Sequence, residues 1–143
     1  IITHGAKLMF AYGEATVPKV TVTLRKSYGG AHCVMSSKQL RGDFNYAWPT
    51  AEIAVMGAAG AIEVLEGRAI SKIENPEEKA KFIADKTAEY NDKFANPYTA
   101  ASYGYIDDVI EPRNTRFRVI RAFQALQTKK QVNPLKKHSN IPL

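Results

Sequence analysis

The chain has 143 residues, of which 45% are hydrophobic and 24% charged, and its formal net charge is +6. This length fits one domain with a core of useful size, and the composition is that of an ordinary globular protein without the run of about eighteen apolar residues that a membrane span needs. The single cysteine, Cys33, excludes an internal disulfide and a cysteine-rich metal site and favours a reducing, intracellular compartment.

The first third of the chain is predicted to form a helix, a strand and a second helix. Residues 1–5 lack an initiator Met and open inside a helical pattern, which we interpret as the start of a fragment cut from a longer chain. Apolar residues recur at helical spacing over residues 3–16, and Pro18 marks the end. β-Branched residues alternate over residues 20–24, which predicts a strand. Residues 27–30 are predicted to form a turn and residues 31–36 the first turns of a helix. A strand–Gly–Gly–helix junction is therefore predicted.

The middle of the chain is predicted to hold a buried strand followed by two helices. Residues 52–56 form a short, nearly continuous apolar run, which is typical of a buried parallel strand. The small residues 57–61 lead into a closely packed helix. Asn75 as a cap, with Pro at the next position and acids in the first turn, predicts a charged surface helix over residues 76–94.

The last third is predicted to hold a short helix over residues 97–102 and a short strand over residues 105–110. A final helix, capped by Asn114 or Thr115, extends to about residue 130, and the tail from residue 133 is irregular. Strands and helices alternate along the whole chain, so the predicted fold class is α/β with a largely parallel sheet.

Positive charge is concentrated at the C-terminal end. Residues 1–111 hold 12 basic and 14 acidic side chains, a net of −2, whereas the residues after Glu111 hold basic side chains and no acidic one. Such a run can attract the phosphate of a nucleic acid or of a nucleotide-like ligand. The tail lacks interleaved aromatics that would stack on bases, so we favour a solvated helix face completed by acidic neighbours in an oligomer, without a nucleic-acid partner.

Five strings resemble the carboxyltransferase (β) subunit family of propionyl-CoA and related acyl-CoA carboxylases, in the order that the family has them. They are residues 2–7 (ITHGAK), 14–21 (EATVPKVT), 25–31 (RKSYGGA), 45–58 (NYAWPTAEIAVMGA) and 136–143 (KKHSNIPL). The match runs from end to end, and only residues 66–78 are weakly patterned.

The resemblance implies a crotonase-like (ClpP/crotonase) β-β-α superhelix. Members of the family carry two such domains, and residues 1–143 resemble the C-terminal part of the second. The first domain mostly holds coenzyme A, the second faces biotin, and each active site forms between domains of different subunits in a ring-shaped hexamer. The chain is therefore expected to hold half of a shared site and to be inactive alone.

The implied reaction transfers a carboxyl group between carboxybiotin and a short-chain acyl-CoA, such as propionyl-CoA to methylmalonyl-CoA. Negative charge then develops on a carbonyl oxygen, which backbone N–H groups can stabilise. A Gly-Gly turn that enters a helix supplies such donors together with the positive end of the helix dipole. Gly30 and Ala31 match the family's oxyanion-hole pair, for either the thioester or the biotin ureido oxygen. Without the resemblance, a plain turn would be the better interpretation of this pattern.

Three neighbouring residues are candidates for substrate binding: Gly29, His32 and Cys33. The family position of Cys33 borders the acyl pocket, and Cys departs from the Asp that many propionyl enzymes carry there. A small buried hydrophobe is the alternative role for this cysteine. His32 occupies a position where the family often has Tyr. This favours a role as an aromatic side chain in the wall of the pocket over a role as a general base.

Other polar residues lack a pattern that carries chemistry. The histidines do not have the spacing of metal ligands, and no metal site is expected. These residues are His4, His32 and His138. Asp43 and Glu52 are interpreted as structural polar groups, and residues 46–49 as core or subunit-interface packing. Apolar residues between positions 46 and 56 are expected to be exposed in this chain, because they would meet the parts of the assembly that it lacks.

The expected partners are a biotin carboxylase/biotin carrier subunit, further copies of the chain and an acyl-CoA. No biotinyl-lysine Met-Lys-Met motif is present, so biotin must arrive on the carrier protein. The bacterial cytoplasm or the mitochondrial matrix is the expected compartment. A methylmalonyl-CoA:pyruvate transcarboxylase subunit, a decarboxylase subunit and an inert assembly or binding fragment are the alternatives.

Overall fold

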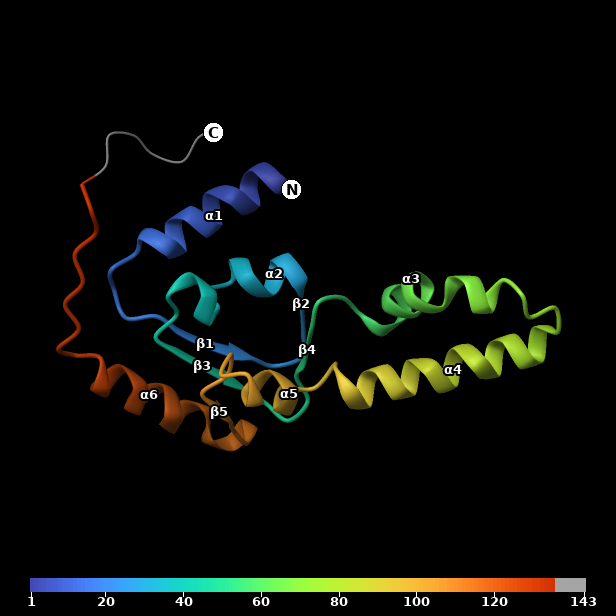
Figure 1. Ribbon diagram of the computed structural model, residues 1–143. Helices are drawn as coiled ribbons and strands as arrows, with labels where there is room; N and C mark the ends of the chain where they lie inside the picture. Colours follow the sequence, from blue (N-terminus) through green and yellow to red (C-terminus); the bar gives the residue numbers. More distant parts are fainter. Residues whose placement is uncertain (136–143) are drawn as a thin grey trace.

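Two β-β-α units follow one another in the computed structural model, which describes residues 1–135 (Figure 1). The first unit comprises β1 (Val20–Thr23), β2 (Lys26–Tyr28) and α2 (Gly29–Val34), and the second comprises β3 (Phe44–Ala47), β4 (Glu52–Ala54) and α3 (Ala58–Ile70). The elements outside these units are α1 (Ile2–Glu14), α4 (Pro76–Lys93), α5 (Pro97–Ser102), β5 (Asp108–Val109), α6 (Thr115–Ala125) and two short 3₁₀ helices (Lys38–Leu40 and Pro112–Asn114).

Equivalent strands of the two units pair in parallel. β1, β3 and β5 form one sheet in that order, and β2 and β4 form a second, smaller sheet. Each unit therefore places its first strand in one sheet and its second strand in the other. The parallel α/β fold that the sequence predicts is present, and so are the β-β-α units that the family resemblance implies.

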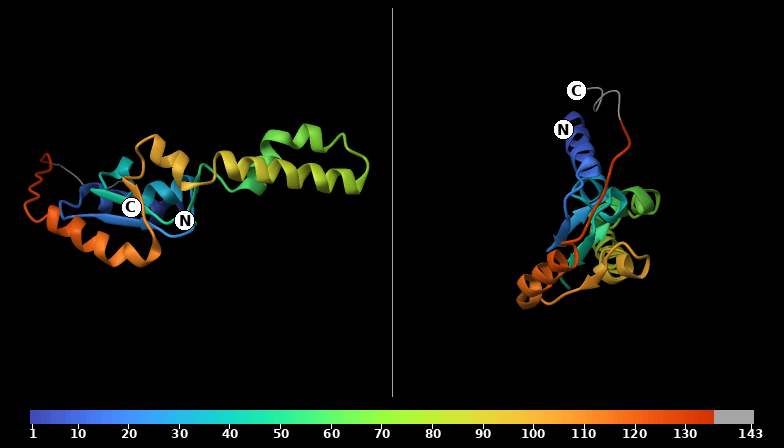
Figure 2. Two further views of the ribbon diagram at one scale, coloured as in Figure 1. Left: turned by 90° about the horizontal axis from the view of Figure 1, so that it is seen from below. Right: turned by 90° about the vertical axis from the view of Figure 1, so that its left-hand side faces the viewer.

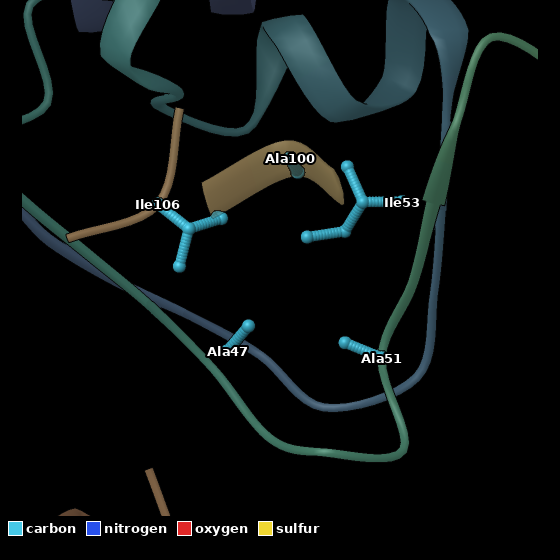
Figure 3. Close-up of a cluster of buried hydrophobic side chains, with 5 residues drawn as sticks. All are labelled: Ala47, Ala51, Ile53, Ala100 and Ile106. Carbon is cyan, nitrogen blue, oxygen red and sulfur yellow. The ribbon is translucent and has the colours of Figure 1, made fainter. Parts of the chain in front are cut away.

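The core lies on the two faces of β3, because successive side chains of a strand point to opposite faces. Ala47, which is completely buried, packs against β4 and α5 in one cluster, whose side chains converge in Figure 3: Ala47, Ala51, Ile53, Ala100 and Ile106. Tyr46 faces the other way, where Ile110 and Ala122 of α6 complete a second cluster. Trp48 packs against this second cluster and donates its Nε1–H to Thr115 Oγ1 at 2.8 Å.

Helices α3 and α4 form a hairpin that extends away from the two sheets (Figures 1 and 2). The cap predicted for α4 is present: Asn75 Oδ1 accepts a hydrogen bond from Glu77 N at 2.9 Å, and Pro76 is the first helical residue. No residue of α4 is fully buried, as expected of a charged surface helix. None of the helices within residues 1–135 is long and apolar enough to cross a membrane.

The structure differs from several expectations about the sheets. Residues 26–28 form strand β2, although residues 27–30 were expected to be a turn, and the strand β3 was not predicted at all. Residues 46, 47, 51 and 53 are buried and not exposed, because they fill the core on either side of β3. Val55 and Met56, in contrast, are exposed, as that expectation had it. They follow the end of β4, so the buried strand predicted over residues 52–56 covers only residues 52–54.

Basic side chains after Glu111 make several contacts within the chain. Arg118 forms an ion pair with Asp108 and lies over the ring of Tyr46, 5.4 Å from its centroid. Lys129 Nζ lies 2.8 Å from Asp43 Oδ2 and donates to Val17 O at 2.9 Å. Part of the positive run is therefore balanced inside the chain, where the sequence suggested acidic neighbours in an oligomer. Lys136, Lys137 and His138 lie outside the described residues.

Asp43 joins the C-terminal segment to the beginning of β3. Its Oδ2 accepts hydrogen bonds from Lys129 Nζ and, at 2.7 Å, from Lys19 N. Burial alone would raise the pKa of Asp43, but the hydrogen bonds from Lys129 and Lys19 outweigh it and hold the pKa below its ordinary value. Glu52, in contrast, accepts a hydrogen bond from Tyr28 OH. The two acids have different partners and therefore do not form a pair.

Replacing Asp43 by Asn is expected to lower the free energy of unfolding by about 1–3 kcal/mol at pH 7, because charge-assisted hydrogen bonds are lost. The folded-state pKa is depressed. The stabilisation is therefore complete above the unfolded-state pKa of about 3.9 and is lost as pH falls through the lower folded-state value. Urea denaturation at stepwise lower pH measures this difference. Asp85→Asn, the same change on the exposed face of α4, is the control, and an equal loss in both variants would contradict the expectation.

Candidate functional site

The junction between β2 and α2 is the strand–Gly–Gly–helix element that the sequence predicts. Tyr28 ends the strand and is the N-cap residue of α2, with an extended backbone. Gly29 follows with φ +50°, a left-handed conformation that favours glycine. A Cβ at Gly29 would lie 2.7 Å from Val55 O, so the close approach to the end of β4 also requires glycine.

Gly30 and Ala31, the predicted donors, are exposed in the first turn of α2. The first N–H groups of a helix have no acceptor within it. A Cβ at Gly30 would meet no atom within 4 Å, so the space beside this turn is open. The turn can therefore present backbone N–H groups to an incoming oxygen atom.

His32 and Cys33 continue the same short helix, and both are half-buried. His32 Nδ1 lies 2.9 Å from Ser27 Oγ, and burial lowers the pKa of the imidazole, which is therefore neutral at pH 7. Ser27 and His32 line a hollow of about 810 Å³ beside β1, together with Met35 and Ser36. Gly30, Ala31 and Cys33 are not among its lining residues. His32 therefore lines this hollow, whereas the turn with the predicted donors Gly30 and Ala31 (the donor turn) does not.

A second turn with glycine lies beside the first, at the junction between β4 and α3. Gly57 is the N-cap residue of α3, and a Cβ there would lie 3.2 Å from Cε2 of Tyr28. Tyr28 also donates a hydrogen bond from its hydroxyl to Glu52 on β4. Sequence reasoning missed this contact, although a glycine between the second strand and the helix of each β-β-α unit is a signal that the two junctions are equivalent.

Within residues 1–135, no group of three or more His, Cys, Asp or Glu side chains could hold a metal ion. The features that the site offers are backbone donors, a neutral imidazole and a tyrosine–carboxylate hydrogen bond.

Comparisons with known proteins match the whole chain to one family. The model of the carboxyl transferase domain covers residues 1–141. The chain is 62% identical over 143 residues to the propionyl-CoA carboxylase beta chain of Cereibacter sphaeroides, and 52% identical over 143 residues to the methylmalonyl-CoA decarboxylase subunit alpha of Propionigenium modestum. In both cases all of this chain and 27% of the relative are covered.

A solved structure agrees with these relatives. The hexamer-forming transcarboxylase 12S, with methylmalonyl-coenzyme A and methylmalonic acid bound, matches with a TM-score of 0.89 at 48% identity, over 100% of this chain and 27% of that chain. The chain thus spans about a quarter of the length of the proteins it matches. The five sequence strings, the parallel β-β-α units and these matches agree, and the chain belongs to the carboxyl transferase domain family, with its crotonase-like fold.

Proposed function

We propose that residues 1–143 are the C-terminal part of a carboxyltransferase domain and provide one half of a shared active site. The complete enzyme would transfer a carboxyl group between carboxybiotin and a short-chain acyl-CoA, with propionyl-CoA and methylmalonyl-CoA as the pair. The observation that carries this proposal is the exposed turn at Gly30 and Ala31, where a Cβ at Gly30 would meet no atom within 4 Å.

The role of this turn is to stabilise negative charge. When bound, carboxybiotin supplies the activated carboxyl group. The N–H groups of Gly30 and Ala31 would donate to the oxygen on which charge develops, either the thioester oxygen or the biotin ureido oxygen. They are held by a backbone that is already folded, so they need little reorganisation during the reaction. Gly29 allows the turn to lie against β4, which fixes the direction of these donors.

His32 and Cys33 would contact the acyl group from the following turn of α2. A neutral His32, with its Nδ1 engaged by Ser27, suits a wall of the pocket better than a proton acceptor. No step of the proposed reaction needs a nucleophilic thiol, so Cys33 would act through its size.

The proposed partners are those that the family resemblance implies. Biotin would arrive on a biotin carboxylase/biotin carrier subunit, and coenzyme A would be held mostly by the other domain of a neighbouring copy in a hexamer. We expect this assembly in a bacterial cytoplasm or a mitochondrial matrix.

Two related activities are supported by the comparisons. The decarboxylase subunit and transcarboxylase 12S are similar to this chain over its full length. Transfer of labelled carboxyl from a carboxybiotin-loaded carrier by the complete subunit tests the proposal. Labelled methylmalonyl-CoA made from propionyl-CoA would support the carboxylase, whereas label passed from methylmalonyl-CoA to pyruvate would support the transcarboxylase. Release of carbon dioxide without an acceptor would indicate the decarboxylase. If the complete subunit transferred no label at all, the remaining interpretation would be that residues 1–143 serve only in assembly or binding.

Enlarging Cys33 to Phe in the complete subunit is expected to change acyl-group selectivity. The added volume should penalise butyryl-CoA more than propionyl-CoA and acetyl-CoA, by about 1–3 kcal/mol in kcat/KM for each misfit methylene-scale contact. Steady-state kinetics with the three thioesters measures this. Equal losses for all three would assign Cys33 a structural role only.

A further inference from the structure

Tyr28 and Glu52 lie on the same face of the small sheet. β2 and β4 pair in parallel with Lys26 opposite Glu52 and Tyr28 opposite Ala54. Because side chains alternate along a strand, Tyr28 shares a face with Lys26 and therefore with Glu52, one diagonal step away. This register brings the phenol of Tyr28 to the carboxylate of Glu52, to which it donates a hydrogen bond.

The ring of Tyr28 is held at a second point, by the β4–α3 turn. A Cβ at Gly57 would lie 3.2 Å from the ring, so the ring rests directly on this glycine. The turn is itself fixed from outside the sheet, since Tyr90 of α4 donates its hydroxyl to Met56 O at 3.1 Å. Tyr28 thus has a defined position relative to β4 at its hydroxyl and along its ring.

Tyr28 directly precedes the turn with the proposed donors. Its backbone leads into Gly29, whose α-carbon stands so close to Val55 O that no larger residue fits. A shift of Tyr28 would move Gly29 and, with it, the N–H groups of Gly30 and Ala31. Misplacement of a reacting group by about 1 Å can cost roughly 100-fold in rate.

We propose that Tyr28 and Glu52 are positioning residues for the donor turn: their hydrogen bond across the small sheet holds Gly30 and Ala31 in the direction that carboxyl transfer requires. This inference rests on the proposed function of that turn. The hydrogen bond to Glu52, followed by burial, raises the pKa of Tyr28 to about 12, with smaller contributions from Tyr90 and, in the opposite sense, Arg25. The phenol therefore keeps its proton at neutral pH and serves as a hydrogen-bond donor, not as a base.

Variants of the complete subunit test the pair. Tyr28→Phe removes one oxygen atom and leaves the ring on Gly57, and Glu52→Leu removes the acceptor. Each is expected to lower kcat about 10-fold, with KM for the acyl-CoA within about twofold, because loosened donors lose part of their effect in the transition state. The double variant should be no slower than the slower single variant, since both changes break the same interaction.

Two comparisons separate positioning from folding. Glu52→Gln keeps an acceptor oxygen and should restore most of the kcat that Glu52→Leu loses. Tyr98→Phe makes the same chemical change at an exposed tyrosine of α5 and should leave kcat unchanged. Melting temperature and oligomer size must match the wild type. If Glu52→Leu does not fold, Tyr28→Phe together with Glu52→Gln still decides the question.

The outcomes distinguish this inference from the proposed function. Wild-type kcat in folded Tyr28→Phe, or a Glu52→Gln variant as slow as Glu52→Leu, would overturn the positioning role. Removal of the Ala31 N–H, by replacing Ala31 with L-lactic acid, gives the reference. If that change lowers kcat and Tyr28→Phe does not, only the positioning inference fails. If neither change lowers kcat, the proposed donor function of the turn is wrong, and the positioning inference, which depends on it, is wrong as well.

Discussion

Residues 1–143 alone are expected to carboxylate no acyl-CoA above the uncatalysed background. The physical reason is that a donor turn accelerates transfer only when both reactants are held against it in a fixed orientation. The turn at Gly30 and Ala31 is exposed, and the chain spans about 27% of its relatives. The domain proposed to hold coenzyme A is outside it.

The measurement compares the purified chain with the complete subunit in the labelled-carboxyl assay, at equal concentrations and with a carboxybiotin-loaded carrier. The complete subunit shows that the assay works. Adding the remaining part of the subunit to the chain is expected to restore transfer if the two halves associate. Turnover by the chain alone, in a preparation verified as free of host carboxylase, would contradict the idea of a shared site.

Local signals in the sequence predicted the starts of α4, α5 and α6, although α6 ends at Ala125 and not near residue 130. Asn75 and Pro76 placed the start of α4, and α5 spans the residues 97–102 that were expected. The cap of α5 is again an asparagine, Asn96, whose Oδ1 accepts from Thr99 N at 2.8 Å. Such caps lie within a few residues of the groups they satisfy, so a single sequence contains the whole interaction.

The strands depended on contacts that lie far apart in the sequence. β3 went unpredicted because the fully buried Asn45 interrupts its apolar pattern, and the backbone N–H of Asn45 is satisfied by Asp107, 62 positions away. β2 is only three residues long and is a strand because β4 pairs with it. Short strands of this kind carry little signal of their own.

Part of the candidate site could likewise be predicted from the sequence, and part depended on contacts between distant residues. The resemblance supplied Gly30 and Ala31, and the structure added why the turn is open and why Gly29 must be glycine. The contact between Tyr28 and Glu52 could not be predicted, because it requires the register of β2 against β4 across 24 positions.

Removing the Ala31 N–H in the complete subunit is expected to lower kcat by roughly 10²–10³, or about 3–4 kcal/mol, with a smaller effect on KM. The sequence predicted that this helix begins at Ala31. It begins at Gly29 instead, so Ala31 is its third residue. Its N–H is still among the donors that a helix leaves free. Replacing Ala31 with L-lactic acid exchanges N–H for oxygen, keeps the methyl group and adds no ring.

Ala31→Pro removes the same N–H but disturbs the residue before it. Gly30 is helical, and a following proline disfavours the helical region, so this variant carries a larger risk to folding than a proline at the first helical position would. Ala31→Ser keeps the N–H while it changes the side chain, so the difference between the Ser and lactate variants isolates the donor. Circular dichroism and oligomer size must match for the comparison to count. If the folded lactate variant turns over as fast as Ala31→Ser, Ala31 donates nothing in the transition state. The opening beside Gly30 would then be only the space that the β2–α2 turn leaves when the backbone comes close to Val55.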